Sequence, residues 1–243
     1  MALKVTVIIP TLNEEESIGK VIDQIKEAFD GAGYTFNEDY EILLVDSSRD
    51  RTPDIGREKG CRIVTEKRKG YGRAYKTGFE EAKGEIICTL DGDLTYPAEE
   101  FPNLIDMLEK DGLDFITCDR LSRLKKGAMT ASHRFGNWVL TTVGNILFHI
   151  KLRDNQSGMW VFRRSILGRM ELTDDGMPLS EEIKIEAFIN PDIKAREVPV
   201  DYRIRVGDVK LNTWGDGKKN LLFLFKKRKM VRKRIKEGKL KKR

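Results

Sequence analysis

The chain has 243 residues, of which 40% are hydrophobic, and this is enough for one sizeable α/β domain with a complete core. No run approaches the roughly 18–20 apolar residues that a membrane-spanning helix needs. The net charge of +6 is unevenly spread, because residues 226–243 hold twelve Lys or Arg and one acid, which leaves 33 basic and 38 acidic residues elsewhere. Such a basic appendage is typical of chains that meet a phosphate-rich partner, either an anionic membrane surface or a nucleic acid.

Strand and helix patterns alternate over the first half of the chain. Short apolar runs predict strands at 5–11, 41–46, 62–65, 85–90 and 114–118. The segments between them predict helices, the first capped by Asn13 with Glu16 as its capping-box partner, and the others at 52–59, at 72–82 and after Pro97. Because the strands are apolar throughout, we expect an α/β fold in which a doubly wound, mostly parallel sheet is covered on both faces.

The second half of the chain is less regular. The basic segment 120–130 has no periodic pattern and is expected to be a mobile loop. Helices are predicted at 135–150 and 179–189, strands at 158–163 and 194–202, and a last helix from residue 218 onward. We therefore expect one domain over 1–217 and a basic, amphipathic helix over 218–243. The apolar face of that helix is expected to carry Leu221, Leu224, Phe225, Val231 and Ile235.

The three cysteines and the N-terminus indicate a compartment. Cys61, Cys88 and Cys118 are widely spaced, and each lies in an apolar, strand-like context. We expect them to be buried free thiols in a reducing cytoplasm. The first ten residues are typical of a first strand and not of a signal peptide.

Polar residues follow three of the predicted strands, at the edge where ligands of an open parallel sheet bind. The first group spans 10–14, the second spans 46–50, and the third is Asp91, Gly92 and Asp93. In the third group, two carboxylates two residues apart can converge on one hard divalent cation, and the glycine permits close approach of a ligand. No dinucleotide-binding G-x-G-x-x-G follows the first strand, and the chain has no P-loop.

These groups belong to longer segments that carry a resemblance to a known family. Four segments, in this order and at this spacing, resemble the family 2 glycosyltransferases: VIIPTLNE at 7–14, LVDSSRDRT at 44–52, KGYGRAYKTGF at 69–79 and LDGDL at 90–94. Two later segments, DNQSG at 154–158 and EVPVDYRIRVGDVK at 197–210, resemble the dolichyl-phosphate mannose and glucose synthase branch. The resemblance covers roughly residues 3–212 and implies a GT-A fold and a nucleotide-sugar donor.

The resemblance implies a donor site at the first four segments. Asp46 matches the carboxylate that accepts a hydrogen bond from the imino N–H of the nucleobase, which uracil and guanine both have. Asn13 is interpreted as a helix cap and not as a ligand. UDP-glucose or UDP-N-acetylglucosamine is the preferred donor, with GDP-mannose left open. The implied donor-binding residues are Pro10, Leu12, Glu14, Asp46, Gly70, Arg73, Asp91 and Gly92.

The resemblance also implies a metal and a catalytic set. Asp91 and Asp93 match the pair that binds Mg²⁺ or Mn²⁺, whereas Thr95 stands where many relatives have a Gln ligand and is left out of the metal set. Glu181 and Glu182 are interpreted as charges at a helix N-terminus and not as a general base, because a phosphate acceptor is already ionised. The implied catalytic residues are Asp93, Asp154, Arg205 and Lys210.

The implied acceptor is a dolichyl or polyprenyl phosphate. Arg120, Arg134 and Asn137 match positions on the acceptor side, where the guanidinium fork suits a phosphate. The implied reaction is a single in-line displacement with inversion at the anomeric carbon. Together with the basic C-terminal helix, this predicts a cytoplasmic enzyme bound peripherally to the anionic inner face of the cell membrane, for glycan assembly.

Two other functions remain as alternatives. A family 2 glycosyltransferase with a soluble hydroxyl acceptor would need a general base and no membrane-binding helix. A nucleic-acid-binding protein could use the basic tail, but the tail has no interleaved aromatic residues for base stacking, and the ordered donor motifs would be unexplained. We therefore expect no nucleic-acid partner.

Overall fold

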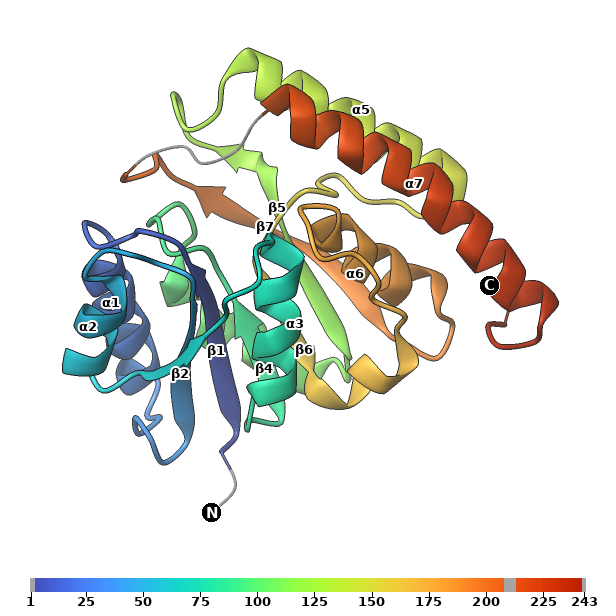
Figure 1. The fold of residues 1–243 in the computed structure, drawn as a ribbon. Coiled ribbons are helices and arrows are strands. Elements are labelled where there is room, and N and C mark those ends of the chain that lie inside the picture. Colours follow the sequence, from blue (N-terminus) through green and yellow to red (C-terminus); the bar gives the residue numbers. More distant parts are fainter. Residues whose placement is uncertain (1–2, 208–212, 242–243) are drawn as a thin grey trace.

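A seven-stranded sheet forms the centre of the computed structural model, which describes residues 3–207 and 213–241 (Figure 1). The strands are β1 (Val5–Thr11), β2 (Tyr40–Asp46), β3 (Arg62–Thr65), β4 (Ile86–Thr89), β5 (Phe115–Leu124), β6 (Trp160–Arg163) and β7 (Ala195–Tyr202). Their order is β3-β2-β1-β4-β6-β5-β7, and only the pairings of β6 with β4 and β5 are antiparallel. The expected mostly parallel α/β sheet is confirmed.

Helices cover both faces of this sheet. They are α1 (Ile18–Gly31), α2 (Thr52–Glu58), α3 (Tyr71–Glu81), α4 (Phe101–Lys110), α5 (Ala131–Phe148), α6 (Leu179–Ile189) and α7 (Thr213–Lys236), with short 3-10 turns at Ala98–Glu100 and Arg164–Arg169. One buried cluster joins α1 and α4 to the sheet, and a second joins α3 and α6 to its opposite face. This double covering explains why β2 is buried along its whole length and β1 at every position except Pro10.

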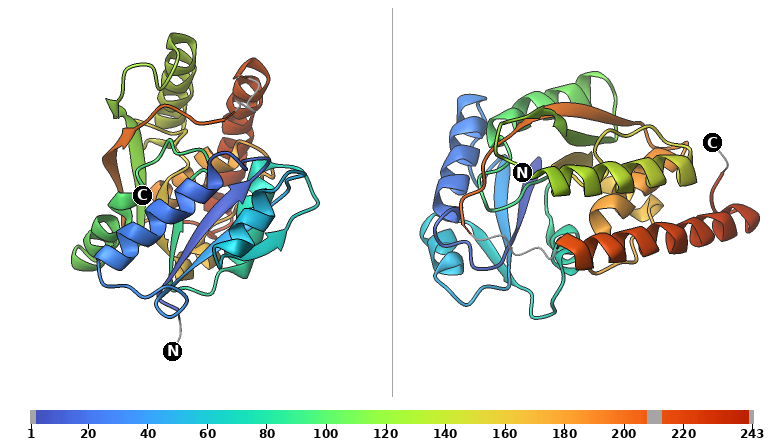
Figure 2. Two further views of the ribbon diagram at one scale, coloured as in Figure 1. Left: turned by 90° about the vertical axis from the view of Figure 1, so that its left-hand side faces the viewer. Right: turned by 90° about the horizontal axis from the view of Figure 1, so that it is seen from above.

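Helices α5 and α7 lie side by side outside the α6 layer (Figures 1 and 2). A third apolar cluster, which includes Leu140 of α5, Ile185 of α6 and Leu224 of α7, joins them to the body. Lys227 is fully buried, and its Nζ lies 2.9 Å from Glu182 and 2.7 Å from Glu186. The expected boundary between residues 217 and 218 falls inside α7. None of the helices in the described ranges is both long and apolar enough to cross a bilayer.

The inward face of α7 differs from the expected apolar stripe. Leu224 and Val231 are buried as expected. Phe225, however, is exposed, and the charged residue Lys227 is buried instead. A lysine can replace an apolar residue at a buried position because the two α6 carboxylates neutralise its charge. These partners lie some 40 residues earlier in the chain, so a helical wheel of α7 does not show them.

Two local predictions were wrong. Asn13 does not cap α1: it has a φ of 53° and its Oδ1 accepts from the Arg49 N–H, while α1 begins at Ile18 after a turn in which Glu14 O accepts from Ile18 N–H. The predicted loop at 120–130 also starts too early, because β5 continues to Leu124 by pairing with β7. The three cysteines are free and buried, as expected.

Candidate active site

Asp91, Gly92 and Asp93 follow β4 at the carboxyl end of the parallel strands. Asp93 is buried, and its Oδ1 accepts from the Thr95 N–H at 3.0 Å and from Thr95 Oγ1 at 2.6 Å. Its Oδ2 lies 3.2 Å from Arg205 Nη1. Sequence reasoning had not assigned a role to Thr95, and the structure shows that it fixes the orientation of the Asp93 carboxylate.

Asp91 is a poorly solvated carboxylate beside a second one. Burial raises its pKa to about 7, and the neighbouring charge of Asp93 acts in the same direction. Two such carboxylates fit a divalent cation, whose charge would favour their ionised forms. The described residues contain no cluster of three or more acidic, His or Cys ligands. Mg²⁺ or Mn²⁺ held here would therefore complete its shell with diphosphate oxygens and water, as Mg²⁺ commonly does.

The segment after β7 closes over this pair of carboxylates. Arg203 N–H donates to Thr95 O at 2.9 Å, and Val206 N–H donates to Asp93 O at 3.0 Å. Between them, Arg205 Nη2 lies 3.5 Å from Glu14 Oε1 in addition to its contact with Asp93. The positively charged guanidinium of Arg205 is thus held beside the place expected for a diphosphate. Lys210, the other predicted cation, lies outside the described residues.

The expected nucleobase end of the site lies where β1 and β2 end together. Asp46 is buried opposite Thr11 in the register of the two strands, and Thr11 Oγ1 donates to its Oδ1 at 2.7 Å. Ser48 N–H donates to Asp46 Oδ2 at 3.3 Å, so the residue also stabilises its own turn. Pro10 pairs with Val45 in the same two strands.

Leu12 is exposed, and Glu14 is buried, with its N–H donating to Thr52 Oγ1. A cavity of about 280 Å³ opens beside them. Its lining is acidic and includes Asn13, Glu14, Glu15, Glu16, Ser17, Asp50 and Gly207. The cavity therefore connects the β1 end with the segment that carries Arg205.

Gly70 and Arg73 lie at the start of α3. Gly70 has a φ of 138°, and a Cβ built on it would clash with the carbonyl oxygen of Asp175, so the position requires glycine. The Arg73 guanidinium lies 3.3 Å from Glu80, 3.7 Å from Glu66 and 3.9 Å from Asp175. Three carboxylates thus share its charge, and its role toward a donor stays a prediction.

Arg120 and Asp154 form a buried, fork-like ion pair, close enough to Asp91 for the Arg120 charge to lower the pKa of that carboxyl. Arg120 Nε and Nη2 lie 2.6 Å and 2.9 Å from the two Asp154 oxygens, and the guanidinium lies 5.2 Å from the Tyr202 ring centre. Burial opposes ionisation of Asp154, but Arg120 holds its pKa below the ordinary value. The other two predicted acceptor residues lie on α5: Arg134 is exposed in its first turn, and Asn137 contacts Met129.

Glu181 and Glu182 lie in the first turn of α6, but both are completely buried, which their sequence position did not indicate. Glu182 accepts from the Thr173 and Asp174 N–H groups and pairs with Lys227. Glu181 accepts from Gln156 Nε2 at 2.9 Å, and burial raises its pKa well above the ordinary value. Glu182 is therefore part of the α6–α7 contact, and Glu181 is a buried hydrogen-bond acceptor whose surroundings disfavour its charged form.

Sequence reasoning missed two further side chains that hold the 154–158 turn. Tyr96 Oη accepts from the Gly158 N–H at 2.7 Å, and the fully buried Lys184 donates to Ser157 O at 2.6 Å. The local signal for Lys184 is its place between Ile183 and Ile185 in the sequence of α6. No comparable pattern marks Tyr96.

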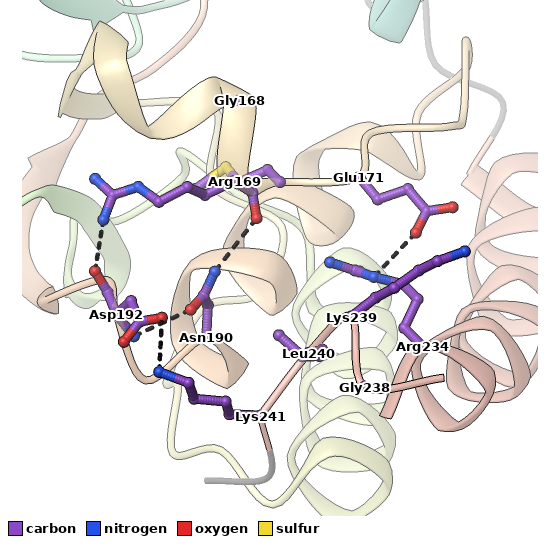
Figure 3. A pocket seen from close by; sticks show the side chains of 11 residues that line it. Gly168, Arg169, Glu171, Asn190, Asp192, Arg234, Gly238, Lys239, Leu240 and Lys241 are labelled. Atoms are coloured by element: carbon purple, nitrogen blue, oxygen red, sulfur yellow. Dashed lines mark hydrogen bonds and ion pairs between the residues drawn. The ribbon is translucent and has the colours of Figure 1, made fainter. Parts of the chain in front are cut away.

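A second cavity, of about 380 Å³, lies away from all of these residues, at the far end of α7 (Figure 3). Arg234 reaches Glu171 across it, and Lys241 lies 3.8 Å from Asp192. Its lining consists of Gly168, Arg169, Met170, Glu171, Asn190, Asp192, Arg234, Gly238, Lys239, Leu240 and Lys241. None of the predicted site residues lines this cavity.

The family pattern that matches this chain and two of the relatives most similar to it are all described as sugar transferases. The pattern described as glycosyl transferase family 2 matches residues 6–170. The low-salt glycan biosynthesis hexosyltransferase Agl6 of Haloferax volcanii is 34% identical over 93% of this chain, and the chain spans only 54% of that relative's length. The dolichyl-phosphate hexose transferase of the same organism is 32% identical over 87% of this chain and 88% of its own.

Two further comparisons concern a longer relative and the fold. The dolichol-phosphate mannosyltransferase of Pyrococcus furiosus is 32% identical over 86% of this chain and 59% of its own. The structure of glucosyl-3-phosphoglycerate synthase from Mycobacterium tuberculosis, in complex with Mn²⁺, UDP and glucosyl-3-phosphoglycerate, superimposes with a TM-score of 0.70 at 20% identity, over 93% of this chain and 80% of that one. At this identity, the superposition shows a shared GT-A fold.

Proposed function

Because the chain belongs to glycosyl transferase family 2, we propose that it transfers a hexose from a nucleotide-sugar to the phosphate of a dolichyl or polyprenyl lipid, for glycan assembly. The observation that carries the proposal is the similarity to the Haloferax dolichyl-phosphate hexose transferase, which extends over most of both chains. The preferred donors are UDP-glucose and UDP-N-acetylglucosamine, with GDP-mannose as the alternative, because Asp46 can accept from either imino N–H.

The proposed reaction needs no general base. A phosphate monoester oxygen is already ionised at neutral pH, so it can attack the anomeric carbon directly. The new carbon–oxygen bond forms on the face opposite the nucleotide while the bond to the nucleoside diphosphate breaks, and the diphosphate leaves with the electron pair. The configuration is therefore inverted. Glu181 accepts a hydrogen bond from Gln156 Nε2, and the proposed reaction gives it no proton to remove.

Charge stabilisation is the main contribution that we propose for the protein. Arg205, already beside Asp93, would donate to the departing diphosphate, and Lys210 is proposed to act with it. Asp91 and Asp93 would hold Mg²⁺ or Mn²⁺, which supplies a positive charge to the diphosphate when bound. Asp154 orients Arg120, and we propose that Arg120, Arg134 and Asn137 face the acceptor phosphate.

We further propose that α5 and α7 dock on the anionic inner face of the cell membrane. Five large apolar side chains on these neighbouring helices are between 51% and 68% exposed: Phe135, Trp138, Ile146, Leu222 and Phe225. Exposed lysines and arginines of α7, among them Lys226, Lys229 and Arg232, accompany them. Exposed apolar side chains combined with basic residues provide the two signals that a peripheral membrane protein needs.

A donor screen tests the proposed reaction. Labelled UDP-, GDP- and ADP-sugars would be added separately to purified protein with polyprenyl phosphate and Mg²⁺. The labelled sugar in the lipid fraction would then be counted. We expect transfer from a UDP-sugar or from GDP-mannose and none from ADP-sugars, because adenine lacks the imino N–H. Transfer from ADP-glucose at a rate equal to the best donor would refute the donor assignment.

A further inference from the structure

The 154–158 turn borders the metal-binding carboxylates. A Cβ built on Gly158 would lie 3.4 Å from Asp91 Oδ1 and 2.6 Å from Tyr71 Oη, so this backbone packs directly against the reacting centre. Any displacement of the turn would therefore change the space beside Asp91.

One contact to the turn comes from the C-terminal helix. Asn220 of α7 is buried, and its Nδ2 donates to Gln156 Oε1 at 2.8 Å. The Gln156 Nε2 in turn donates to Glu181 Oε2 of α6 at 2.9 Å. The Gln156 side chain thus lies between two helices, and each end of its amide makes one hydrogen bond.

The contact matters because α7 is firmly held at its next turns. Lys227 lies seven residues after Asn220, on the same face of the helix, and is fully buried between Glu182 and Glu186. Breaking a buried pair of this kind is strongly unfavourable. Helix α7 is therefore a fixed support for Asn220 and not a loosely attached tail.

We propose that Asn220 and Gln156 are positioning residues, through which α7 holds the 154–158 turn against Asp91. They touch neither donor nor acceptor themselves and act through the backbone of the turn. The proposal rests on the proposed function only in naming the reaction. It gives the C-terminal helix, which lies outside the 6–170 family match, a part in the geometry of the active site.

A particular kinetic pattern follows from this arrangement. The turn lies beside Asp91, whereas the expected nucleobase contact, Asp46, lies at the end of β2. Loss of the Gln156 hydrogen bonds would therefore misplace the reacting groups without removing contacts to the nucleotide. A displacement of about 1 Å can cost up to about 100-fold in rate. We expect kcat to fall about tenfold or more, while the donor KM stays within about twofold.

The experiment compares three single variants of the full chain and the double variant Gln156→Met/Asn220→Leu. Gln156→Met removes both hydrogen bonds at similar volume, and Asn220→Leu removes the one to α7. The matched control is Arg234→Met, which removes ion pairs of α7 with Glu171 and Glu186 but makes no contact with the turn. For each variant, kcat, donor KM, Tm and hydrogen exchange of the 154–158 backbone would be measured.

We expect both turn variants to lose kcat and to exchange faster at 154–158, and the double variant to be no worse than Gln156→Met. Arg234→Met should lower Tm at least as much, with kcat within about twofold of the parent. An unchanged kcat and exchange rate in Asn220→Leu, or a loss of kcat that follows Tm in all variants including the control, would overturn the proposal. If Gln156→Met does not fold, Asn220→Leu decides the matter.

The two proposals fail in different ways. Activity of the parent with polyprenyl phosphate reports on the proposed reaction alone. The positioning role is judged from ratios of variant to parent with whichever acceptor the parent uses, and from hydrogen exchange, which needs no turnover. Faster exchange at 154–158 without transfer to a lipid phosphate would support the positioning role and contradict the proposed function.

Discussion

The guanidinium of Arg205 lies 3.2 Å from the Asp93 carboxylate, which joins the segment after β7 to the loop that follows β4. Backbone hydrogen bonds on both sides of Arg205, to Thr95 O and Asp93 O, hold the two segments together. The contact places a cation at the edge of the proposed metal site. Both partners are therefore expected to affect turnover, but in different ways.

Replacement of Asp93 tests the metal site. Asp93→Asn should abolish metal-dependent transfer, because a neutral amide binds a hard divalent cation more weakly than a carboxylate does, and only the Asp91 carboxylate would remain. Arg205→Ala should keep metal binding and lower kcat by about 100-fold or more, as expected when one preorganised donor to a developing charge is lost. Calorimetric titration with Mn²⁺ and steady-state kinetics distinguish these outcomes.

Thr95→Val provides the matched control for these variants. It removes the hydrogen bond to Asp93 while preserving volume and both carboxylates. We expect at most about a tenfold loss of kcat, with Mn²⁺ binding retained. Full activity of metal-depleted parent enzyme in EDTA would show that the site is not a functional metal site.

Asp46 is expected to bind the nucleobase. Loss of a hydrogen bond to a charged group costs about 1.5–3 kcal/mol, so Asp46→Ala should weaken donor binding at least about tenfold. Asp46 also accepts from Thr11 and Ser48, so thermal unfolding must be measured alongside to separate binding from folding. An unchanged calorimetric affinity of the folded variant for the donor would refute the role.

Glu181 is expected to make stability depend on pH. Burial raises its pKa well above 4.5, and Asp174 and Glu182 act in the same direction, while the Gln156 hydrogen bond and Lys184 lower it. Above about pH 4.5 the unfolded chain releases this proton and the native chain keeps it, so the contribution of Glu181 to stability falls as pH rises toward the folded pKa. The slope is at most about 1.4 kcal/mol per pH unit.

The variant Glu181→Gln isolates this contribution. It keeps an acceptor for Gln156 and removes the titration, so its stability relative to the parent should rise as pH increases above about 4.5. Denaturant unfolding at several pH values measures the difference. A parent that becomes more stable than the variant as pH rises would show that Glu181 is ionised in the fold.

The exposed apolar residues of α5 and α7 are expected to bind membranes. Phe135→Ser and Trp138→Ser should reduce sedimentation with anionic vesicles and leave Tm nearly unchanged, because both side chains are exposed. Exchange of Lys226 and Lys229 for Gln should remove part of the salt-dependent binding. Equal sedimentation of parent and variants at low salt would contradict membrane docking through this face.

The local parts of the fold were predictable from sequence, and the long-range parts were not. The bounds of β1, β3 and α6 agree with the predicted ranges, because apolar runs and helical stripes are local patterns. The insertion of β6 between β4 and β5 could not be predicted, because a strand's sequence does not specify its neighbours. The burial of Lys227 likewise depends on carboxylates that are distant in sequence.

The candidate site shows the same division. Asp46, Asp91 and Asp93 could be identified because ligand-binding residues of parallel sheets follow the strand ends. The pairing of Arg120 with Asp154 and the link from Asn220 to Gln156 join segments more than 30 residues apart. Such contacts depend on tertiary packing, and no spacing rule within one segment predicts them.

Transfer to a matched pair of lipids tests the central claim most directly. Polyprenyl phosphate and the polyprenol of the same chain length would be offered with labelled donor and Mg²⁺, and the label in the lipid fraction would be followed over time. We predict transfer only to the phosphate, with inverted configuration at the anomeric carbon, because the proposed reaction depends on an acceptor that is already ionised. Faster transfer to the polyprenol, or to a water-soluble hydroxyl acceptor, would contradict it.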